Sequence, residues 1–229
     1  MERVSKRLRG QLVLDGVNMT VPDSAIVVVL GPSGAGKTVL LKIIAGLIPP
    51  DSGQVLYDGT PLRYGRVVDN EPILKRIGFV FQTGALFDWL NVAENVALPL
   101  TEKTHLSKNE IKERVAQSLN DVGMTGAAKL KVRELSGGMV KLVAIARALV
   151  NDPSYLFFDE PTSGLDPANR ERVCQLITEV SKKGKRSVVV VTHDLESARR
   201  LAERFYLLKG NQLVLAVDVK KEDYEPACP

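Results

Sequence analysis

The 229-residue chain contains few cysteines and no long apolar run, and each shortage excludes a class of protein. Cys174 lies inside a helical pattern and Cys228 near the end, so their spacing indicates neither a disulfide framework nor a metal site. A reducing compartment suits such a chain. The first residues lack the apolar core of a signal peptide, and runs such as Ala25 to Leu30 are far shorter than the roughly 18 residues of a spanning helix. We therefore expect that the chain does not cross a membrane by itself.

An excess of one charge is also missing. The sequence has 31 Lys and Arg against 27 Asp and Glu, a formal net charge of +4. The basic residues are scattered apart from an N-terminal cluster of Arg3, Lys6, Arg7 and Arg9. They form no basic stripe of the kind that binds nucleic acid. The cluster is more typical of a solvated edge, with contact to anionic lipid or phosphate as the alternative. The hydrophobic content of 45% is ample for the core of a globular enzyme or binding module.

The most informative stretch is a glycine-rich loop between the apolar run Ala25 to Leu30 and the periodic run Val39 to Leu47. Its residues are Gly31, Pro32, Ser33, Gly34, Ala35, Gly36, Lys37 and Thr38. Between a strand and a helix, such glycines let successive backbone N–H groups surround a phosphate, and the helix N-terminus adds the positive end of its dipole. We expect Lys37 to reach the β- and γ-phosphates and Thr38 to hold Mg²⁺. The alternative, an accidental glycine-rich turn, is rare at ordinary glycine usage.

Apolar runs and turn signals predict the rest of the fold. Extended segments are expected at Gln11 to Leu14, Val17 to Val21, Gln54 to Tyr57, Ile77 to Phe81, Tyr155 to Phe158 and Ser187 to Val191, with a closing hairpin of Tyr206 to Leu208 and Leu213 to Val217. Helices are expected around Asn91 to Val96, behind the capping box of Ser107 and Glu110, from Asp166 to Gly184, and over Asp194 to Glu203. Strands separated by helices predict a parallel, doubly wound α/β core. We expect residues from about 85 to 150 to form an inserted helical subdomain, and residues of about 1–84 and 151–229 to form the α/β core.

Two carboxylates follow one of the predicted buried strands. The run Tyr155 to Phe158 leads directly into Asp159 and Glu160. Ligands gather at this end of the strands in an open α/β sheet. Asp159 suits the coordination shell of Mg²⁺, and Glu160 suits polarising or deprotonating the water that attacks a γ-phosphate. A solvated strand end is the alternative, and the phosphate loop favours the catalytic interpretation.

A second glycine turn opens a later helix. Ser136, Gly137 and Gly138 present a hydroxyl and backbone N–H groups at the helix N-terminus, which suits an anion. Local chemistry alone favours the alternative, an ordinary serine cap followed by a flexible glycine pair.

The motifs together identify a family. The chain carries G-P-S-G-A-G-K-T, Gln82, L-S-G-G-M, L-F-F-D-E-P, S-G-L-D-P and His193 in this order, and over nearly all 229 residues it resembles an ABC transporter ATPase subunit. The resemblance implies a P-loop NTPase fold of the ABC ATPase type, with a mostly parallel core sheet and N-terminal antiparallel strands. It also implies a homodimer that sandwiches two ATP molecules, each bound by the phosphate loop of one chain and the Ser136 to Gly138 turn of the other.

The same resemblance assigns roles to further residues. His193 would contact the γ-phosphate beside the catalytic Glu160, and Asp166 would communicate across the dimer. Gln82 would link Mg²⁺ to the helical subdomain, so that Thr38, Gln82 and Asp159 form the predicted Mg²⁺ site. A lone histidine after a strand is more often structural, and Gln82 alone would carry no meaning. Their order among the other motifs supports the assignment.

A narrower resemblance concerns the cargo. The segments Phe81 to Phe87, Asn91 to Leu100 and Gly123 to Leu130, with a signature that ends in Met139, are similar to the ATPases of MCE-type lipid transporters such as the Mla phospholipid system. This implies an integral permease of the MlaE type, a periplasmic MCE protein, sometimes a STAS-domain protein, and a place on the cytoplasmic face of the cell membrane. A generic small-solute importer ATPase and a non-transport ABC regulator or scaffold are the alternatives. A monomeric P-loop kinase fails, since it needs an acceptor site where this chain has the Ser136 to Gly138 turn, called the signature turn below.

Three features depart from the family pattern. Residues 1–10 hold no aromatic to stack on adenine, so Lys6 or Arg9 would have to cover the base. Met139 replaces a common Gln, and Leu142 falls where a basic residue is common. The sequence also ends soon after the predicted hairpin, from which we expect no appended regulatory domain.

Overall fold

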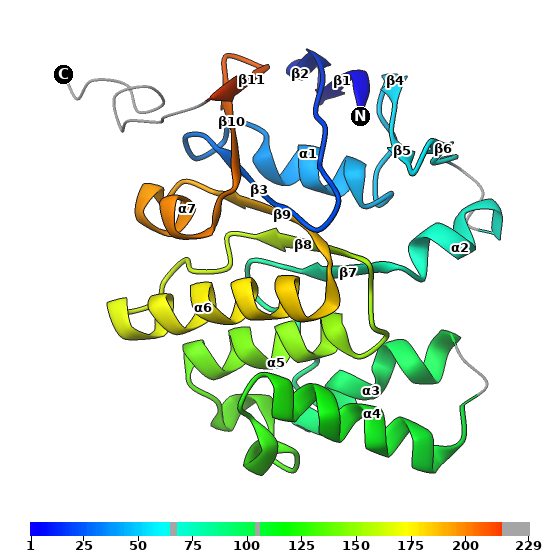
Figure 1. The fold of residues 1–229 in the computed structure, drawn as a ribbon, viewed down its shortest axis with the longest axis vertical. Helices are drawn as coiled ribbons and strands as arrows, with labels where there is room; N and C mark the ends of the chain where they lie inside the picture. Colours follow the sequence, from blue (N-terminus) through cyan, green and yellow to red (C-terminus); the bar gives the residue numbers. More distant parts are fainter. Residues whose placement is uncertain (65–67, 104–105, 217–229) are drawn as a thin grey trace.

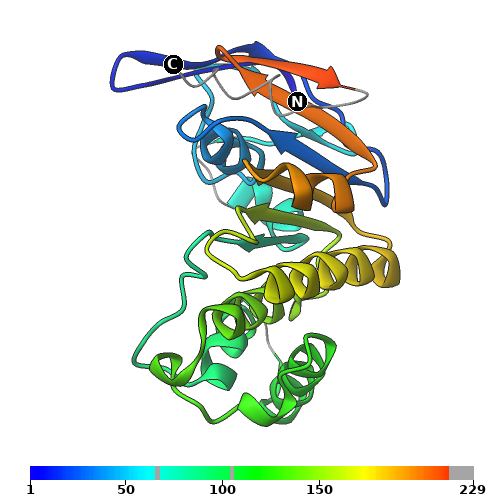
Figure 2. The ribbon, with the colours of Figure 1, turned by 90° about the vertical axis from the view of Figure 1, so that its left-hand side faces the viewer.

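The computed structural model describes residues 1–64, 68–103 and 106–216. The molecule is elongated, with antiparallel N-terminal strands at one end and two helices, α3 (Val92–Lys103) and α4 (Lys108–Asp121), at the other (Figure 1, Figure 2). A larger sheet crosses the middle. Within the described ranges, no helix is long and apolar enough to span a membrane.

The central sheet has six strands in the order β11-β10-β3-β9-β8-β7. They are β3 (Ile26–Leu30), β7 (Ile77–Val80), β8 (Tyr155–Asp159), β9 (Ser187–Thr192), β10 (Arg204–Lys209) and β11 (Gln212–Ala216). All neighbouring pairs are parallel except β10 with β11, which form the predicted closing hairpin. Val217, its predicted last residue, lies outside the described ranges, as does Cys228.

The strands β3 and β9 are buried on both faces. Val27, Val29, Val189 and Val191 belong to one hydrophobic cluster, whereas Val28 and Val190 belong to another. Helix α1 (Lys37–Ile44) packs into the first cluster. The second receives α5 (Gly137–Leu149), α6 (Pro167–Gly184) and α7 (Leu195–Leu201). Helices on both faces explain why the strands are continuous β-branched runs and not alternating ones.

The strands at the N-terminal end of the molecule differ in part from the extended segments that the sequence predicts. Three antiparallel strands, β1 (Glu2–Leu8), β2 (Gln11–Val17) and β4 (Ser52–Gln54), pair in the order β2-β1-β4. The predicted extended segment Val17 to Val21 is wrong, because β2 ends at Val17. Strand β1 was not predicted, since its charged side chains hide any apolar alternation. The predicted strand Gln54 to Tyr57 is divided between β4 and β5 (Leu56–Tyr57), which pairs with β6 (Thr60–Pro61).

The predicted helix caps are confirmed. Ser107 and Glu110 form a reciprocal capping box at α4, and the Asp166 side chain accepts a hydrogen bond from Asn169 N at the start of α6. Helix α1 begins at Lys37, so the phosphate loop leads directly into it. The remaining short helices are η1 (Val68–Asn70), α2 (Glu71–Leu74), η2 (Thr125–Ala127) and η3 (Val132–Glu134).

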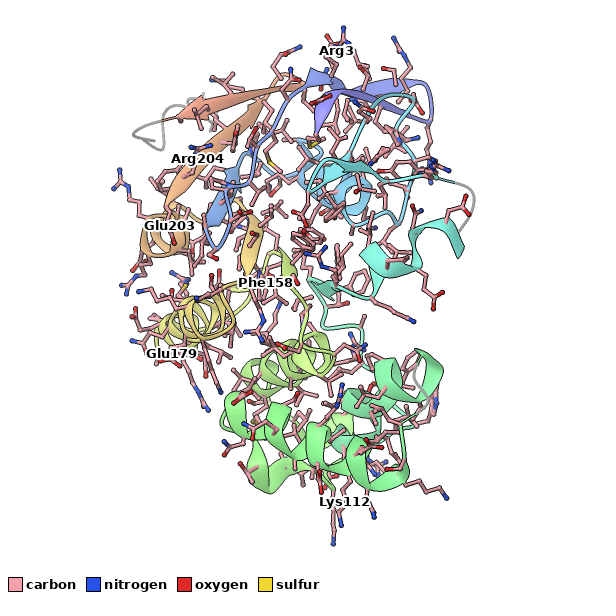
Figure 3. All side chains as sticks on the ribbon, turned by 45° about the vertical axis from the view of Figure 1, so that its right-hand side comes forward. Arg3, Lys112, Phe158, Glu179, Glu203 and Arg204 are labelled. Carbon is pink, nitrogen blue, oxygen red and sulfur yellow. The ribbon has the colours of Figure 1, made fainter. Side chains whose placement is uncertain are left out.

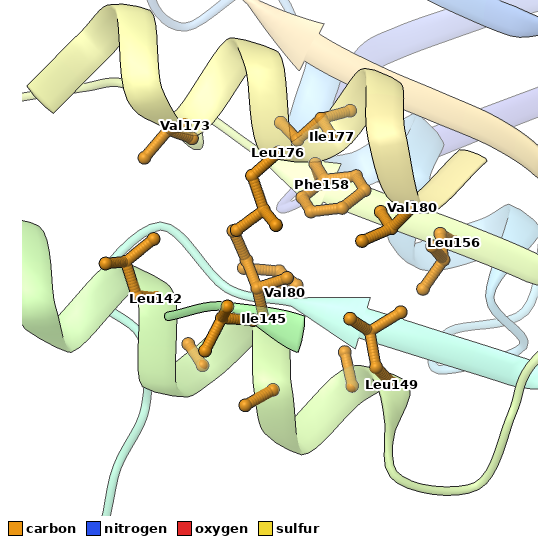
Figure 4. Packing of buried hydrophobic residues seen from close by; sticks show 14 of the residues in the cluster. Val80, Leu142, Ile145, Leu149, Leu156, Phe158, Val173, Leu176, Ile177 and Val180 are labelled. Atoms are coloured by element: carbon orange, nitrogen blue, oxygen red, sulfur yellow. The ribbon is translucent and has the colours of Figure 1, made fainter. Parts of the chain in front are cut away.

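Helix α5 joins the helical end of the molecule to the sheet. It contacts α3 and α4 on one side and β7 and α6 on the other. Leu142, Ile145 and Leu149 of α5 lie close to Phe158 and Leu176 in one continuous core (Figure 4). Figure 3 shows Phe158 inside the molecule and charged side chains such as Lys112 and Glu179 at its surface. The division into a core of about 1–84 and 151–229 and a helical subdomain of about 85–150 stays a prediction.

Candidate nucleotide-binding site

The glycine-rich loop lies at the carboxyl end of β3, where two of its glycines are required by their surroundings. A Cβ atom at Gly31 would lie 2.6 Å from the carbonyl oxygen of Leu208 in the neighbouring strand. Gly36 has a φ of 100° and caps α1, and a Cβ there would lie 2.5 Å from Cγ1 of Val13. Residues with side chains avoid such a φ, so both the backbone angle and the space demand glycine. The loop is thereby pressed between the central sheet and β2.

Lys37 folds back across this loop. Its Nζ donates hydrogen bonds to the carbonyl oxygens of Gly31 at 2.9 Å and Pro32 at 3.0 Å. It also lies 3.3 Å from Oε1 of Glu160, with both side chains almost fully buried. A buried ion pair of this kind is held by its additional hydrogen bonds. The ammonium therefore stands inside the glycine loop and faces the carboxylate predicted to be catalytic.

Thr38 and Asp159 meet next to this pair. The Thr38 hydroxyl donates a 2.9 Å hydrogen bond to Oδ1 of Asp159, the last residue of β8. Burial raises the pKa of the Asp159 carboxyl above its ordinary value, and the hydrogen bond from Thr38 opposes that shift. A hydroxyl and a carboxylate side by side are the hard oxygen ligands that Mg²⁺ prefers.

Glu160 is held from several sides at the end of β8. Its backbone N donates to Val191 O at 2.9 Å, and its φ is 47°, unusual for a residue with a side chain. Oε2 accepts hydrogen bonds from the Thr192 hydroxyl at 3.0 Å and from His193 N at 3.3 Å, and Nδ1 of His193 lies 3.0 Å from the same oxygen. The predicted residues Lys37, Thr38, Asp159, Glu160 and His193 are thus brought together.

The register of the parallel strands produces this cluster. Leu30 pairs with Thr192, and Val191 pairs with Asp159, so the residues that follow β3, β9 and β8 emerge at one edge of the sheet. Such an edge is where open α/β sheets bind their ligands.

The signature turn and Asp166 are not part of the cluster around Lys37 and Glu160. Ser136 caps α5, accepting a hydrogen bond from Met139 N, and Gly138 lies so close to Asn169 that a Cβ would be 2.9 Å from its Oδ1. Asn169 also donates a hydrogen bond from Nδ2 to Oδ2 of Asp166 at 2.5 Å. Gly138 and Asp166, both predicted site residues, therefore lie next to the same asparagine. In the described part of the chain, no hydrogen bond or ion pair joins Ser136, Gly137 or Gly138 to the phosphate loop.

Gln82 follows β7 and is exposed. Its backbone carbonyl accepts a hydrogen bond from Lys141, a buried residue of α5 that the sequence interpretation missed. Thr192 and Asn169 were missed as well. The available signal for Lys141 was a lysine within the otherwise apolar stretch of α5, whereas a threonine at a strand end and an asparagine in a helix carry no such signal.

The departures from the family pattern receive different explanations. Lys6 Nζ donates a 2.8 Å hydrogen bond to Asp51, so this ammonium already has a partner, and cover of the base by Lys6 or Arg9 stays a prediction. That bond and one from Arg7 N lower the pKa of the Asp51 carboxyl. Leu142 is buried in the core beneath the sheet, which accounts for an apolar residue at this position.

The glycine loop between β3 and α1, its lysine, and an apolar strand ending in two carboxylates define a P-loop nucleotide hydrolase. The chain belongs to the ABC transporter family, whose family model, described as "ABC transporter", matches residues 14–163. Proteins of this family are ATPases whose cassettes dimerise and work with a membrane permease. The chain is an ATP-hydrolysing subunit of that kind.

Relatives and solved structures agree with this placement. The chain is 38% identical over 206 residues to the intermembrane phospholipid transport system ATP-binding protein MlaF of Haemophilus influenzae, covering 89% of this chain and 77% of the relative. It is 38% identical to Escherichia coli MlaF over 93% of this chain and 80% of the relative. A dimeric structure of the ATP-binding cassette MJ0796 bound to ADP and Pi superimposes with a TM-score of 0.84 at 34% identity, covering 93% of this chain and 94% of that one. The predicted fold is confirmed.

We expect the Gly36→Ala variant to lose nucleotide affinity, because the added methyl group meets Val13 and displaces the loop. Gly59 has a comparable φ of 80° but open space around it, so Gly59→Ala is a matched control for backbone strain. Backbone strain should lower the free energy of unfolding by about 1 kcal/mol in both variants, and the contact with Val13 should add to the loss in Gly36→Ala. Only Gly36→Ala should weaken ATP binding, measured by calorimetric titration. Equal affinities in the two variants would contradict a loop whose shape depends on the contact with Val13.

Proposed function

We propose that this chain drives a transporter that moves phospholipid or a related lipid between membranes, and that it hydrolyses ATP at two sites shared by a homodimer. One observation carries the ATPase part: Lys37, Glu160, His193 and the Thr38–Asp159 pair converge at one edge of the sheet. The likeness to MlaF over most of both chains supports the cargo. Each part has its own test.

In the proposed reaction, the backbone N–H groups of residues 31–38 surround the phosphates and Lys37 Nζ reaches the β- and γ-phosphate oxygens. Glu160 orients and deprotonates the attacking water, and His193 contacts the γ-phosphate. Thr38, Asp159 and Gln82 would hold Mg²⁺, which when bound neutralises charge on the phosphates. The donor set fits this ion, because it offers oxygen ligands with a single carboxylate, and Mg²⁺ usually takes one or two carboxylates and completes its shell with phosphate and water.

The separation of the signature turn supports a shared site. Gly138 lies against Asn169 in α6 of its own chain, and among the described residues no hydrogen bond or ion pair joins Ser136, Gly137 or Gly138 to the phosphate loop. In the homodimer, the turn of one protomer would close over the nucleotide bound by its partner, with Asp166 beside it. The dimeric ADP-bound cassette with the same fold is consistent with this arrangement.

An exposed apolar surface is suited to the permease. Phe87 and Trp89 are 41% and 72% exposed, and their rings pack together with centroids 4.8 Å apart. Beside them lies a groove of about 630 Å³ that Leu47, Phe79 and Phe81 help to line. Exposed apolar patches of this kind mark interaction sites. We assign it to an MlaE-type permease, with an MCE protein and a STAS-domain protein as further subunits, on the cytoplasmic face of the cell membrane.

The shared site predicts different defects from two substitutions. Lys37→Ala should abolish ATP binding, because it removes the charge that the phosphates contact. Ser136→Arg should leave ATP binding to the isolated chain nearly intact and remove hydrolysis, because it blocks closure by the partner. Fluorescent-nucleotide titration and phosphate release measure the two properties. Equal loss of binding in both variants would mean that the turn belongs to the site of its own chain.

The permease surface predicts that Trp89→Asp breaks the transporter without harming the ATPase fold. Tagged protein would be purified from detergent-solubilised membranes, and co-purifying integral proteins and lipids identified by mass spectrometry. We expect an MlaE-type permease with the parent chain and at least about tenfold less with Trp89→Asp, as for loss of an interface anchor. Val214→Asp is the matched control, because Val214 is 59% exposed on β11.

Two outcomes of that purification would contradict the proposal. Recovery without any integral protein would favour a regulator or scaffold, and a small-solute permease would favour the generic importer.

A further inference from the structure

Lys141 is a charged residue in the middle of a buried helix face. It is 6% exposed, and Leu142, Val143 and Ala144, which follow it in α5, are buried as well. Burial lowers the pKa of the Lys141 ammonium, while the charges of Glu160 and Asp159 oppose the shift. An ammonium inside a protein is costly unless it is hydrogen-bonded. Its partners therefore show what the lysine stabilises.

Those partners are two backbone carbonyl groups at the ends of neighbouring strands. Lys141 Nζ donates hydrogen bonds to Gln82 O and, at 3.3 Å, to Glu160 O. The parallel pairing of β7 with β8 runs as far as Val80 with Phe158, two residues earlier in each strand. The lysine thus bridges the two strands where their own pairing has ended.

The backbone of Glu160 needs such support. A positive φ in a residue other than glycine costs of the order of 1–3 kcal/mol and persists only where the surroundings impose it. The Glu160 amide is held by Val191 O, and its carbonyl accepts hydrogen bonds from Ser163 N at 3.2 Å, within the following turn, and from Lys141. The contacts from β9 and α5 tie the peptide groups on both sides of Glu160 to other elements of the fold, and of these two the Lys141 contact is the one made by a side chain.

Helix α5 also holds the segment that follows β7. Arg147 donates hydrogen bonds to Gly84 O at 2.7 Å and to Ala85 O at 2.6 Å. Gly84 lies against Val140, where an added Cβ would be 2.8 Å from Cγ1. Lys141 and Arg147 therefore attach residues 82–85 to α5. Of these two side chains, Lys141 also donates a hydrogen bond to Glu160.

We propose that Lys141 is a positioning residue for ATP hydrolysis, which places the Glu160 carboxylate correctly only while α5 is seated against the ends of β7 and β8. Because α5 begins at the Ser136 to Gly138 turn, closure of that turn on a partner's nucleotide is linked through Lys141 to the hydrolytic carboxylate of its own chain. The inference rests on the proposed role of Glu160 and adds a physical connection between the two sites of the dimer.

The test is the Lys141→Met variant, which keeps the length of the side chain and removes its donors. We expect kcat to fall about 10- to 100-fold, as for a displaced catalytic group, while KM for ATP stays nearly unchanged. Lys141→Arg should restore most of the rate, because it keeps a cation with several donors. If the methionine variant does not fold, Lys141→Leu, which also has no donor, serves in the same comparison. A parallel rise in KM, or no rescue by arginine, would overturn the proposal.

Arg147→Met is the matched structural control. It removes a cation of the same helix that binds the same segment without a hydrogen bond to Glu160. We expect a lower melting temperature in both variants but a marked loss of kcat only in Lys141→Met. Equal losses of kcat would show that attachment of residues 82–85, and not the bridge to Glu160, is what hydrolysis requires.

A double-mutant cycle separates this inference from the role of Glu160. In the Glu160→Gln background, Lys141→Met should cause no further loss of the slow residual hydrolysis, and ATP-dependent dimerisation should persist. Additive losses would refute the positioning role alone. A Glu160→Gln protein that hydrolyses ATP at the parent rate would refute both the assignment of Glu160 and the inference.

Discussion

The site depends on the parallel pairing of β3, β9 and β8. Pairing of Leu30 with Thr192 and of Val191 with Asp159 brings three chain segments to one sheet edge. Each contributes a different chemistry: a glycine loop with a lysine, a hydroxyl followed by an imidazole, and two carboxylates. Since side chains alternate along a strand, a shift of one residue in any pairing would turn these groups to the other face. The hydrophobic clusters on both faces oppose such a shift, so packing of the core and assembly of the site are one requirement.

A second constraint is the position of α5. This helix is packed into the core under the sheet, yet it begins with the signature turn, which lies away from its own phosphate loop. The same helix holds the carbonyl groups of Gln82 and Glu160 through Lys141. A helix that carries the proposed partner-facing turn at one end and contacts the proposed hydrolytic residue along its side is well suited to link dimer closure to chemistry. Ala85 and Phe87 both line the groove, so the proposed permease surface adjoins the segment that α5 holds.

Sequence reasoning succeeded where local chemistry determines structure. Gly36 requires a positive φ, Asp166 and Ser107 are strong helix caps, and an apolar strand ending in Asp159 and Glu160 has few interpretations. It failed for β1, whose charged residues are extended only because β2 and β4 pair with them. Lys141 could not be assigned either, because its partners lie 59 and 19 residues away and are backbone atoms that have no sequence signature. Tertiary placement supplied what composition and periodicity lack.

The central claim is that ATP is held between two copies of the chain. The most direct test is the molar mass of the Glu160→Gln protein in solution with and without Mg-ATP, measured by light scattering after size exclusion. Because this substitution should reduce hydrolysis to a slow residual rate and leave phosphate binding intact, we predict twice the chain mass of 25.0 kDa in saturating Mg-ATP and a single chain mass without nucleotide. A protein that binds ATP yet stays at the mass of one chain would contradict the shared site.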